Sequence, residues 1–314
     1  MNFIILTISL LLMVFGANLL VNGAVDIANR FDINEFIVGA LIVGIGTSLP
    51  ELAVSLSATI DGLNDVAVGN VIGSNIFNIL AILGITSIIY PITINKESAK
   101  FDLPFCGIIS AIAFILSFNI FTNNPFELPF ELSRIDGLIF LILFAVYIFI
   151  SLKINKNVSN DIVYKQQSLI KTILCIIIGL ILLIINCDLF INSAVNIARN
   201  LKVSESFISL TIISCGTSMP ELVSSVTAAI KKKSDIAIGN IIGSNIFNIA
   251  FILGTCSIIQ PLNNSNITSI DYFIMILSTM MVICCGIFGK INRKIGLIML
   301  LSFISYTAYL THLQ

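Results

Sequence analysis

Two glutamates, Glu51 and Glu221, lie within long apolar stretches of the chain. An ionised carboxylate at the centre of a bilayer costs several kcal/mol, so a charged group in that position marks a functional site by default. Two buried carboxylates that face each other repel unless a proton or a cation lies between them. The two residues therefore predict a cation site that takes one carboxylate from each half of the chain.

Hydroxyl and amide side chains recur at helical spacing near each glutamate. Thr47 and Ser48 precede Glu51 by four and three residues, which places the three side chains on one helical face. Ser74 and Asn78 are also four residues apart. The second half of the chain carries the same set, namely Thr217, Ser218, Glu221, Ser244 and Asn248.

A proline beside each glutamate adds backbone oxygens to the predicted site. Pro50 has no N–H to donate to the carbonyl of Gly46, and its ring pushes that carbonyl aside; Pro220 does the same to Gly216. Freed carbonyls at membrane depth line a cavity or find a partner. The complete set is oxygen only, which suits hard cations. Ca²⁺ takes six to eight oxygens in flexible geometry whereas Mg²⁺ keeps its waters, so the set favours Ca²⁺. Na⁺ accepts the same oxygens.

The composition requires a membrane for these residues. Hydrophobic residues make up 57% of the 314 residues and charged residues only 11%, against about 25% charged in soluble domains. The seven cysteines lie in apolar runs, where a thiol behaves as a small hydrophobe. The single histidine, His312, lies near the end of the chain and excludes a histidine relay. No basic block suggests nucleic acid, and no cofactor or obligate protein partner is predicted.

The apolar stretches predict an all-α membrane protein with ten spans. A span needs about 20 apolar residues. Because the second and seventh stretches are too long for one helix, and the third and eighth carry polar clusters, we expect these four helices to be broken. The expected spans are 3–24, 33–60, 66–90, 103–120, 135–152, 168–190, 203–230, 236–260, 272–289 and 295–311.

The chain is similar to itself at an offset of 170 residues. Residues 39–84 and 209–254 are identical at 25 of 46 positions, including GTSLPEL against GTSMPEL and GNVIGSNIFNI against GNIIGSNIFNI. The predicted organisation is a first repeat over 1–152, a short linker over 153–167 and a second repeat over 168–314. Five spans per repeat is an odd number, so the second repeat must enter the membrane from the opposite face, as in many secondary transporters.

Basic residues fix the expected orientation. With the N-terminus outside, thirteen of the 16 Lys and Arg residues fall in cytoplasmic loops, and only Arg134, Arg199 and Lys202 fall outside. The positive-inside rule therefore places both termini outside the cell and the 153–167 loop in the cytoplasm. No basic residue precedes the first apolar run, so we expect that run to be a retained span in the plasma membrane.

The other polar residues rate lower as site candidates. Asp65 and Asp235 are predicted to be helix N-caps. Asn70 and Asn240 either tie the broken helices together or line the ion pathway. Asp188 guards an entrance or has no part in the site, and the run Lys231–Lys233 is interpreted as a topology anchor.

The paired GTSxPEL and GNxxGSNIFNI segments resemble the two α-repeats of the Ca²⁺/cation antiporter superfamily, specifically its prokaryotic sodium/calcium exchangers. The resemblance implies ten helices, a central site for one Ca²⁺ or about three Na⁺, and sliding of the first and sixth helices. It implies Ca²⁺ carboxylates at Glu51 and Glu221, backbone oxygens from Thr47 and Thr217, and Asn78 at the centre. The implied flanking Na⁺ sites use Ser48, Ser74, Ser218 and Ser244.

Asn248 departs from the family pattern, because several members, including K⁺-dependent ones, carry Asp there. The amide argues against K⁺ dependence and leaves both Na⁺ and H⁺ open as the coupling ion. We therefore expect Na⁺/Ca²⁺ antiport, with antiport of H⁺ for Ca²⁺ or of another divalent cation as the alternative at the same glutamates. A channel would need a filter, and an enzyme would need a nucleophile–base pair or a cofactor motif; neither pattern is visible in the sequence.

Overall fold

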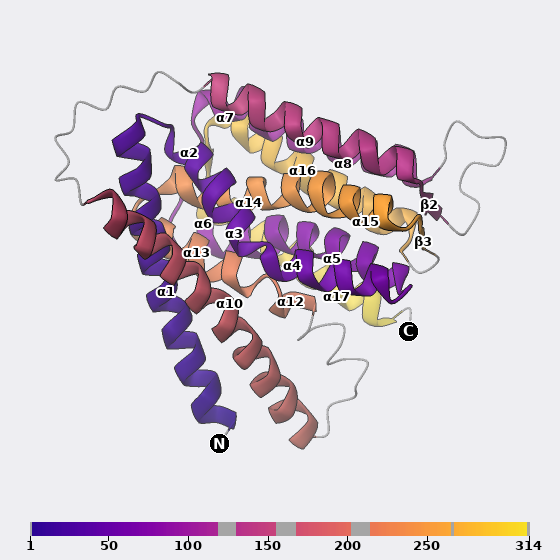
Figure 1. Cartoon of the computed structure of the whole chain (residues 1–314), viewed down its shortest axis with the longest axis horizontal. Helices are drawn as coiled ribbons and strands as arrows, with labels where there is room; N and C mark the ends of the chain where they lie inside the picture. The colour runs from indigo at the N-terminus through magenta and orange to yellow at the C-terminus, as the bar shows by residue number, and fades with distance from the viewer. Residues whose placement is uncertain (1, 119–129, 155–167, 202–213, 265–266, 313–314) are drawn as a thin grey trace.

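In the part of the chain that the structure describes, the protein is a bundle of helices with two very short β-ribbons. The computed structural model describes residues 2–118, 130–154, 168–201, 214–264 and 267–312. The first half (Figure 1) contains α1 (Asn2–Phe31), α2 (Glu35–Val38), η1 (Gly39–Gly44), α3 (Ile45–Thr47), α4 (Leu49–Ile60), α5 (Asn64–Ile76), η2 (Phe77–Leu83), α6 (Gly84–Ile89), β1 (Ile92–Thr93), α7 (Lys96–Lys100), α8 (Asp102–Ser117), β2 (Phe130–Leu132) and α9 (Arg134–Ile154).

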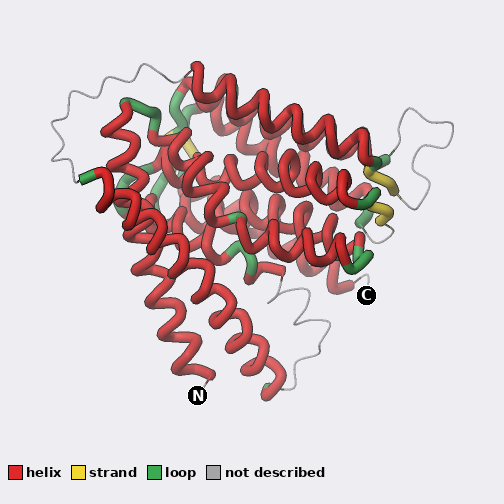
Figure 2. Tube along the Cα trace, viewed as in Figure 1, coloured by secondary structure: helices red, strands yellow, loops and turns green. Residues whose placement is uncertain are grey.

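The second half repeats most of this order. Figure 2 shows that helices dominate the described part of the chain and that the strands are very short. It contains α10 (Leu169–Asn200), α12 (Ser214–Gly216), α13 (Met219–Ile230), α14 (Ser234–Ile246), η4 (Phe247–Leu253), α15 (Gly254–Ile259), β3 (Leu262–Asn264), α16 (Ser269–Phe288), β4 (Lys290–Ile291) and α17 (Arg293–His312). The elements labelled η are π-helical, with a wider turn than an α-helix.

Several of these helices can cross a membrane. Among the described residues, seven helices are long and apolar enough, or eight when the bent pair Glu35–Thr47 and Leu49–Ile60 is taken as one span. The expected spans 203–230 and 295–311 correspond to α12 with α13, and to α17. Residues 202–213, at the start of the former, lie outside the described residues.

The second expected span is broken, as its length predicts. The axes on either side of Ser48 differ by 46°, and Ser48 itself leaves the helical backbone conformation (φ −84°, ψ 8°). Ser218 adopts nearly the same conformation (φ −88°, ψ 11°) between α12 and α13. In both places the proline lies in the first turn of the helix that follows, where its missing N–H costs no intrahelical bond.

The third and eighth expected spans differ from the prediction because they are not broken. Asn64–Ile89 and Ser234–Ile259 each form one helical run of 26 residues. Each run widens into a π-helical segment, η2 or η4, at the polar cluster. A π-helical segment absorbs the irregularity while the backbone stays hydrogen-bonded, and such segments are frequent at functional sites.

These two helical runs are the core of the bundle. The most apolar window of Asn64–Ile89 is 78% buried, and that of Ser234–Ile259 is 94% buried. Glycines allow α14 to lie directly against the backbone of α2 and η1. A Cβ added at Gly239 would lie 2.2 Å from the carbonyl oxygen of Phe36, and one added at Gly243 would lie 2.4 Å from the Cα of Ala40.

The helices α1 and α10 lie side by side and are inclined to the rest of the bundle (Figure 1). They cross at two glycines, because a Cβ on Gly16 would lie 2.9 Å from the carbonyl oxygen of Gly179, and a Cβ on Gly179 would lie 2.7 Å from that of Gly16. Small residues at such crossings let membrane helices approach closely.

Equivalent elements of the two halves make equivalent contacts. The ribbon β1–β4 pairs Ile92 with Ile291, and the ribbon β2–β3 pairs Leu132 with Leu262, which is the repeat equivalent of Ile92. Gly84 in α6 packs closely on Gly296 in α17. Its repeat equivalent, Gly254 in α15, packs in the same way on Gly137 in α9.

Candidate functional site

The two glutamates occupy the first turns of α4 and α13, directly after the two helix breaks. Both are fully buried. The hydroxyl of Ser218 donates to Glu51 Oε1 (2.7 Å), and the hydroxyl of Ser48 donates to Glu221 Oε1 (2.8 Å). The two halves of the chain are therefore joined by a reciprocal pair of hydrogen bonds, each from a serine of one repeat to the glutamate of the other.

The second oxygen of each carboxylate has no hydrogen-bond partner among the described residues. Glu51 Oε2 and Glu221 Oε2 are both buried in this state. An unsatisfied buried acceptor is costly, and an ionised one more so. The two carboxyl groups are also close enough to repel each other electrostatically. Such a pair requires protons or a cation.

Asn78 and Asn248 present two further unsatisfied oxygens. Asn78 Nδ2 donates to Asn245 Oδ1 (3.0 Å), and Asn248 Nδ2 donates to Asn75 Oδ1 (3.1 Å). These bonds occupy the amide nitrogens and assign the orientation of each amide. Within the part of the chain that the structure describes, Asn78 Oδ1 and Asn248 Oδ1 are buried and have no partner. Both amides therefore offer an acceptor, as a cation ligand must.

Asn75 and Asn245 were not among the predicted residues, although the sequence holds a signal for them. Each amide donates to the other's backbone carbonyl, at 3.3 Å from Asn75 and 3.2 Å from Asn245. They therefore join α5 and α14 across the two repeats. Each asparagine directly follows a predicted site serine, Ser74 or Ser244, and the same Ser-Asn pair occurs in both repeats. This repetition could have identified them.

The remaining predicted serines and threonines lie in the same place. Ser218 donates to Ser74 Oγ (3.2 Å), and Ser244 is 3.5 Å from Glu221 Oε1 while it also donates to the carbonyl of Gly44. Thr47 Oγ1 donates to Asn240 Oδ1 (3.1 Å), and Thr217 lies against the carboxylate of Glu51. All ten predicted site residues are buried. Hydrogen bonds thus gather eight of the ten predicted residues around the two carboxylates, whereas Asn78 and Asn248 are bonded to Asn245 and Asn75.

Asn70 and Asn240 hold the turns that carry the glutamates. Asn70 Nδ2 donates to the backbone carbonyl of Glu51 (3.1 Å) and to Ser55 Oγ (2.9 Å). Asn240 Nδ2 makes the equivalent bonds to the carbonyl of Glu221 (3.3 Å) and to Ser225 Oγ (2.8 Å). These contacts correspond to the first of the two interpretations, in which Asn70 and Asn240 tie the broken helices together.

One of the two predicted free carbonyls is already bonded. Cys187 in α10 donates its thiol to the carbonyl oxygen of Gly216 (3.2 Å). The Gly216 carbonyl lies at the end of α12, next to the helix break at Ser218, and its partner in the structure is a side chain of α10. Cys187 was predicted only to pack as a small hydrophobe. All seven cysteines are free thiols.

The predicted N-caps are wrong. The helix α5 begins at Asn64 with Leu63 as its N-cap, and α14 begins at Ser234 with Lys233 as its N-cap. Asp65 and Asp235 therefore lie inside the first turn, where a carboxylate is favoured by the helix dipole. Asp235 additionally accepts from Asn95 Nδ2 (3.2 Å).

The basic run after α13, which was interpreted as a topology anchor, contacts two other helices. Lys233 forms an ion pair with Glu35 (2.6 Å). Lys231 Nζ donates to Asn22 Oδ1 (2.7 Å) and to the carbonyl of Asn18 (3.2 Å) in α1. Partial burial lowers the pKa of Lys231 below its usual value. The end of α13 is therefore attached to both α1 and α2.

Comparisons with known proteins identify the family of this chain. The model of the sodium/calcium exchanger protein family matches residues 1–153 and 171–312. The inner membrane protein YrbG of Escherichia coli is 32% identical over 98% of this chain and 95% of its own. The sodium/calcium exchanger MaX1 of Methanosarcina acetivorans is 26% identical over 99% of both chains.

A solved structure of the sodium-calcium exchanger NCX_Mj, soaked with Na⁺ and Ca²⁺, superposes with a TM-score of 0.85. Its sequence is 30% identical, and the match covers 98% of this chain and 97% of that one. Over nearly its whole length, this chain belongs to the sodium/calcium exchanger family.

Proposed function

We propose that this membrane protein exports Ca²⁺ in exchange for Na⁺, by exposing one mid-membrane site to the two sides in turn. The family is one of cation antiporters and not of enzymes. The site that we propose consists of Glu51 and Glu221 with Thr47, Thr217, Ser48, Ser218, Ser74, Ser244, Asn78 and Asn248.

The observation that carries this proposal is that four of the buried unsatisfied oxygens belong to the predicted site residues and lie at equivalent positions of the two repeats. Glu51 Oε2, Glu221 Oε2, Asn78 Oδ1 and Asn248 Oδ1 are buried acceptors without a donor in the described part of the chain. They come from symmetry-equivalent positions of the two repeats. A set of carboxylate and amide oxygens without sulfur or imidazole suits a hard cation that gives up its water, which describes Ca²⁺ better than Mg²⁺.

The charge of this set supports exchange with Na⁺. Two ionised carboxylates are neutralised by one Ca²⁺, so the loaded site avoids most of the cost of moving charge through a bilayer. Na⁺ accepts the same oxygens, and the serines beside the glutamates offer further hydroxyl ligands. Protonation of the same two carboxylates is the step that antiport of H⁺ for Ca²⁺ would require.

The proposed architecture is ten spans in two inverted repeats, over 1–152 and 168–314. It is supported by the equivalence of the two ribbons, whose strands β1 and β3 are repeat mates. It is also supported by the equivalent glycine contacts of α6 with α17 and of α15 with α9. An inverted repeat places equivalent elements at opposite faces of the membrane.

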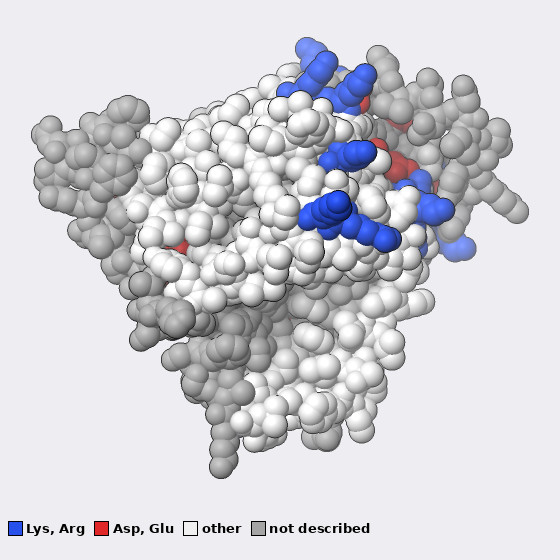
Figure 3. Space-filling view, turned by 180° about the vertical axis from the view of Figure 1, so that it is seen from behind, with Lys and Arg blue, Asp and Glu red and all other residues white. Residues whose placement is uncertain are grey.

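For orientation we propose that both termini lie outside the cell and that the 153–167 loop lies in the cytoplasm. Basic residues gather at one end of the molecule, as the face in Figure 3 shows. The rule that cytoplasmic loops are rich in Lys and Arg assigns that end to the inside. Export of Ca²⁺ from the cell requires the plasma membrane.

Transport into proteoliposomes tests the proposed function. We expect vesicles loaded with Na⁺ to take up ⁴⁵Ca²⁺ when an outward Na⁺ gradient is imposed, and a pH gradient alone to drive no uptake. We expect Glu51→Gln and Glu221→Gln each to reduce uptake by roughly 100-fold or more, because each substitution removes half of the charge that holds the ion.

The matched control is Glu97→Gln, which makes the same chemical change at an exposed carboxylate on α7. It should transport at the normal rate. Near-normal uptake by either site variant would rule out the proposed site. Uptake driven by the pH gradient and not by Na⁺ would assign the protein to antiport of H⁺ for Ca²⁺.

A further inference from the structure

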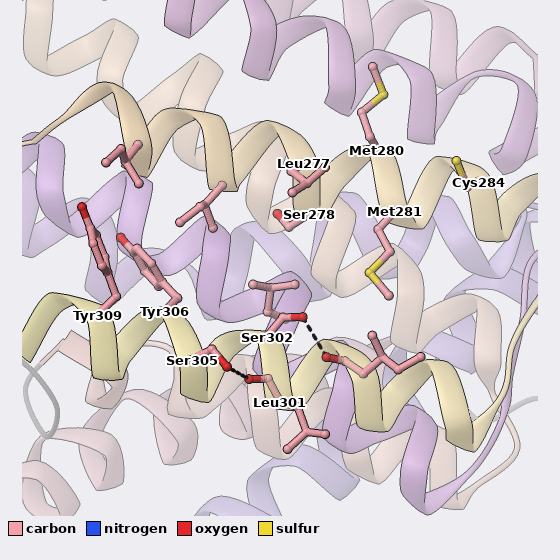
Figure 4. Close-up of a pocket in the computed structure, with 14 residues that line it drawn as sticks. Leu277, Ser278, Met280, Met281, Cys284, Leu301, Ser302, Ser305, Tyr306 and Tyr309 are labelled. Carbon is pink, nitrogen blue, oxygen red and sulfur yellow. Dashed lines mark hydrogen bonds between the residues drawn. The ribbon is translucent and has the colours of Figure 1, made fainter.

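A long apolar groove runs along the outside of the bundle between α16 and α17. Its volume is about 950 Å³. Figure 4 shows its walls, with Leu277, Met280 and Met281 on one helix and Leu301 with Ser302 on the other. The hydroxyls of Ser302 and Ser305 donate to carbonyls of their own helix, so they offer little polarity to the groove.

One end of the groove carries exposed basic side chains. Lys290 lies in β4, between the two helices, and Arg293 and Lys294 begin α17; all three are exposed. Lys294 precedes the groove residue Ile298 by four residues and Leu301 by seven, so the three share a face of α17. In the part of the chain that the structure describes, no ion pair involves these three basic side chains.

Apolar side chains border the same end. Ile287 and Phe288, at the end of α16, are 79% and 77% exposed. Exposed apolar residues beside lysines are typical of a segment at the membrane–water interface. The basic end of the groove therefore lies where phospholipid headgroups lie.

A buried carboxylate lies next to the opposite end of the groove. Tyr306, which lines the groove, donates its hydroxyl to Asp271 Oδ1 (2.7 Å). Asp271 is buried and also accepts from the backbone and the hydroxyl of Thr268. A negatively charged headgroup is disfavoured beside this carboxylate. The charges therefore favour a phospholipid whose headgroup lies at the basic end of the groove.

We propose that this groove binds an anionic phospholipid of the surrounding membrane, with its phosphate on Lys290, Arg293 and Lys294 and an acyl chain between α16 and α17. An α-helix rises by roughly 1.5 Å per residue, so the stretch of α17 from Lys294 to Ser305 is about 16 Å long. That length is about half of the hydrocarbon core, which is roughly 30 Å thick. One acyl chain of the leaflet at the basic end therefore matches the part of the groove that begins at Lys294.

The bound chain would touch the core of the protein. Leu80 belongs to η2 and lines the groove, and it lies two residues after Asn78. The lipid therefore contacts the same π-helical segment that carries one of the four unsatisfied oxygens.

The absence of tryptophan from the chain provides a direct test. A single Trp introduced by Leu301→Trp would be the only one, and it would report on the lipids in the groove. Position 301 is 52% exposed. The protein would be reconstituted into mixtures of brominated phosphatidylglycerol or brominated phosphatidylcholine with the unbrominated lipids, because bromine quenches a neighbouring Trp.

The matched control is Val146→Trp on α9. Val146 is 40% exposed, and it lies seven residues from the exposed Lys153, as Leu301 does from Lys294. We expect phosphatidylglycerol to be preferred over phosphatidylcholine roughly fivefold more strongly at position 301 than at position 146, because basic side chains at the surface attract anionic lipids.

Charge removal then identifies the headgroup site. Adding Arg293→Gln and Lys294→Gln should lower the preference at position 301 to that at position 146. Adding Lys153→Gln and Lys171→Gln, which removes two exposed charges outside the groove, should leave it unchanged. Equal preference at both positions would overturn the proposal. Protection of the Trp at position 301 from every brominated lipid would also overturn it, since it would mean that protein covers the groove.

Discussion

The amide of Asn248 sets the charge of the proposed site. Its nitrogen donates to Asn75, and its oxygen is one of the four buried acceptors. A carboxylate in the same place would supply a stronger ligand but would add a third negative charge to a buried cluster. With an amide, one Ca²⁺ balances the two glutamates, and the site needs no further cation.

We expect Asn248→Asp to retain Ca²⁺ transport but to change its dependence on Na⁺ and on pH. An ionised Asp cannot donate to Asn75, whereas a protonated one restores the neutral, donating group, so protons should compete with cations at this position. Initial rates of ⁴⁵Ca²⁺ uptake, measured against pH and Na⁺ concentration, would reveal this.

The same substitution at Asn263, an exposed residue of β3, provides the control. It should leave both dependences unchanged. If Asn248→Asp also left them unchanged, Asn248 would lie off the ion pathway.

At the scale of elements, close backbone packing positions the site. The helix α14 lies against α2 and η1 with glycine at its contact points, and it carries Asn240 and Ser244 into the site. Backbone-to-backbone contacts leave no flexible side chain that could move aside. The position of this helix is therefore fixed by its contacts with α2 and η1.

We expect Gly239→Ala to destabilise the protein by about 1–3 kcal/mol, the usual cost of overpacking a core. The new Cβ would lie 2.2 Å from the carbonyl oxygen of Phe36, so one backbone must shift. A lower thermal unfolding midpoint in detergent would reveal this loss.

Gly107→Ala is the matched control, because the nearest atom there is the terminal Cδ1 of Ile283 at 2.8 Å, which can rotate away. Its unfolding midpoint should stay close to that of the unchanged protein. Equal midpoints for the two variants would contradict the proposed rigidity of the contact between α14 and α2.

At the scale of the whole molecule, the sides of the membrane on which the two ribbons lie distinguish an inverted repeat from a parallel one. The ribbon β1–β4 pairs a strand of the first half of the chain with a strand of the second half. In the chain, β1 is followed by α7 and β4 by α17, and both of these helices begin with a basic residue. The ribbon β2–β3 contains β3, the repeat mate of β1. In an inverted repeat the two ribbons must lie on opposite sides of the membrane.

We expect a cysteine at Glu131, exposed on β2, to react with a membrane-impermeant maleimide in intact cells. A cysteine at Lys290, exposed on β4, should react only after the cells are permeabilised. Both substitutions would be made in a variant that lacks the seven native cysteines. Labelling of both positions from the same side would contradict the inverted topology.

The sequence alone determined the membrane class, the repeat and the types of residue in the proposed site. The composition requires lipid around most of the chain, because the charged residues are too few to cover the surface of a soluble protein. Buried glutamates with hydroxyls at three and four residues indicate a cation site, because local spacing fixes which side chains share a helical face. The break beside Ser48 follows from the length of the apolar run and from Pro50.

Only the tertiary structure decided which groups meet across the two halves. The bonds from Ser218 to Glu51 and from Cys187 to the carbonyl of Gly216 join residues that are far apart in sequence, and no local spacing predicts such pairs. The π-helical form of η2 and η4 was also decided there, because each segment is apolar except for one asparagine, and so uniform a sequence does not distinguish an α-helical turn from a π-helical one.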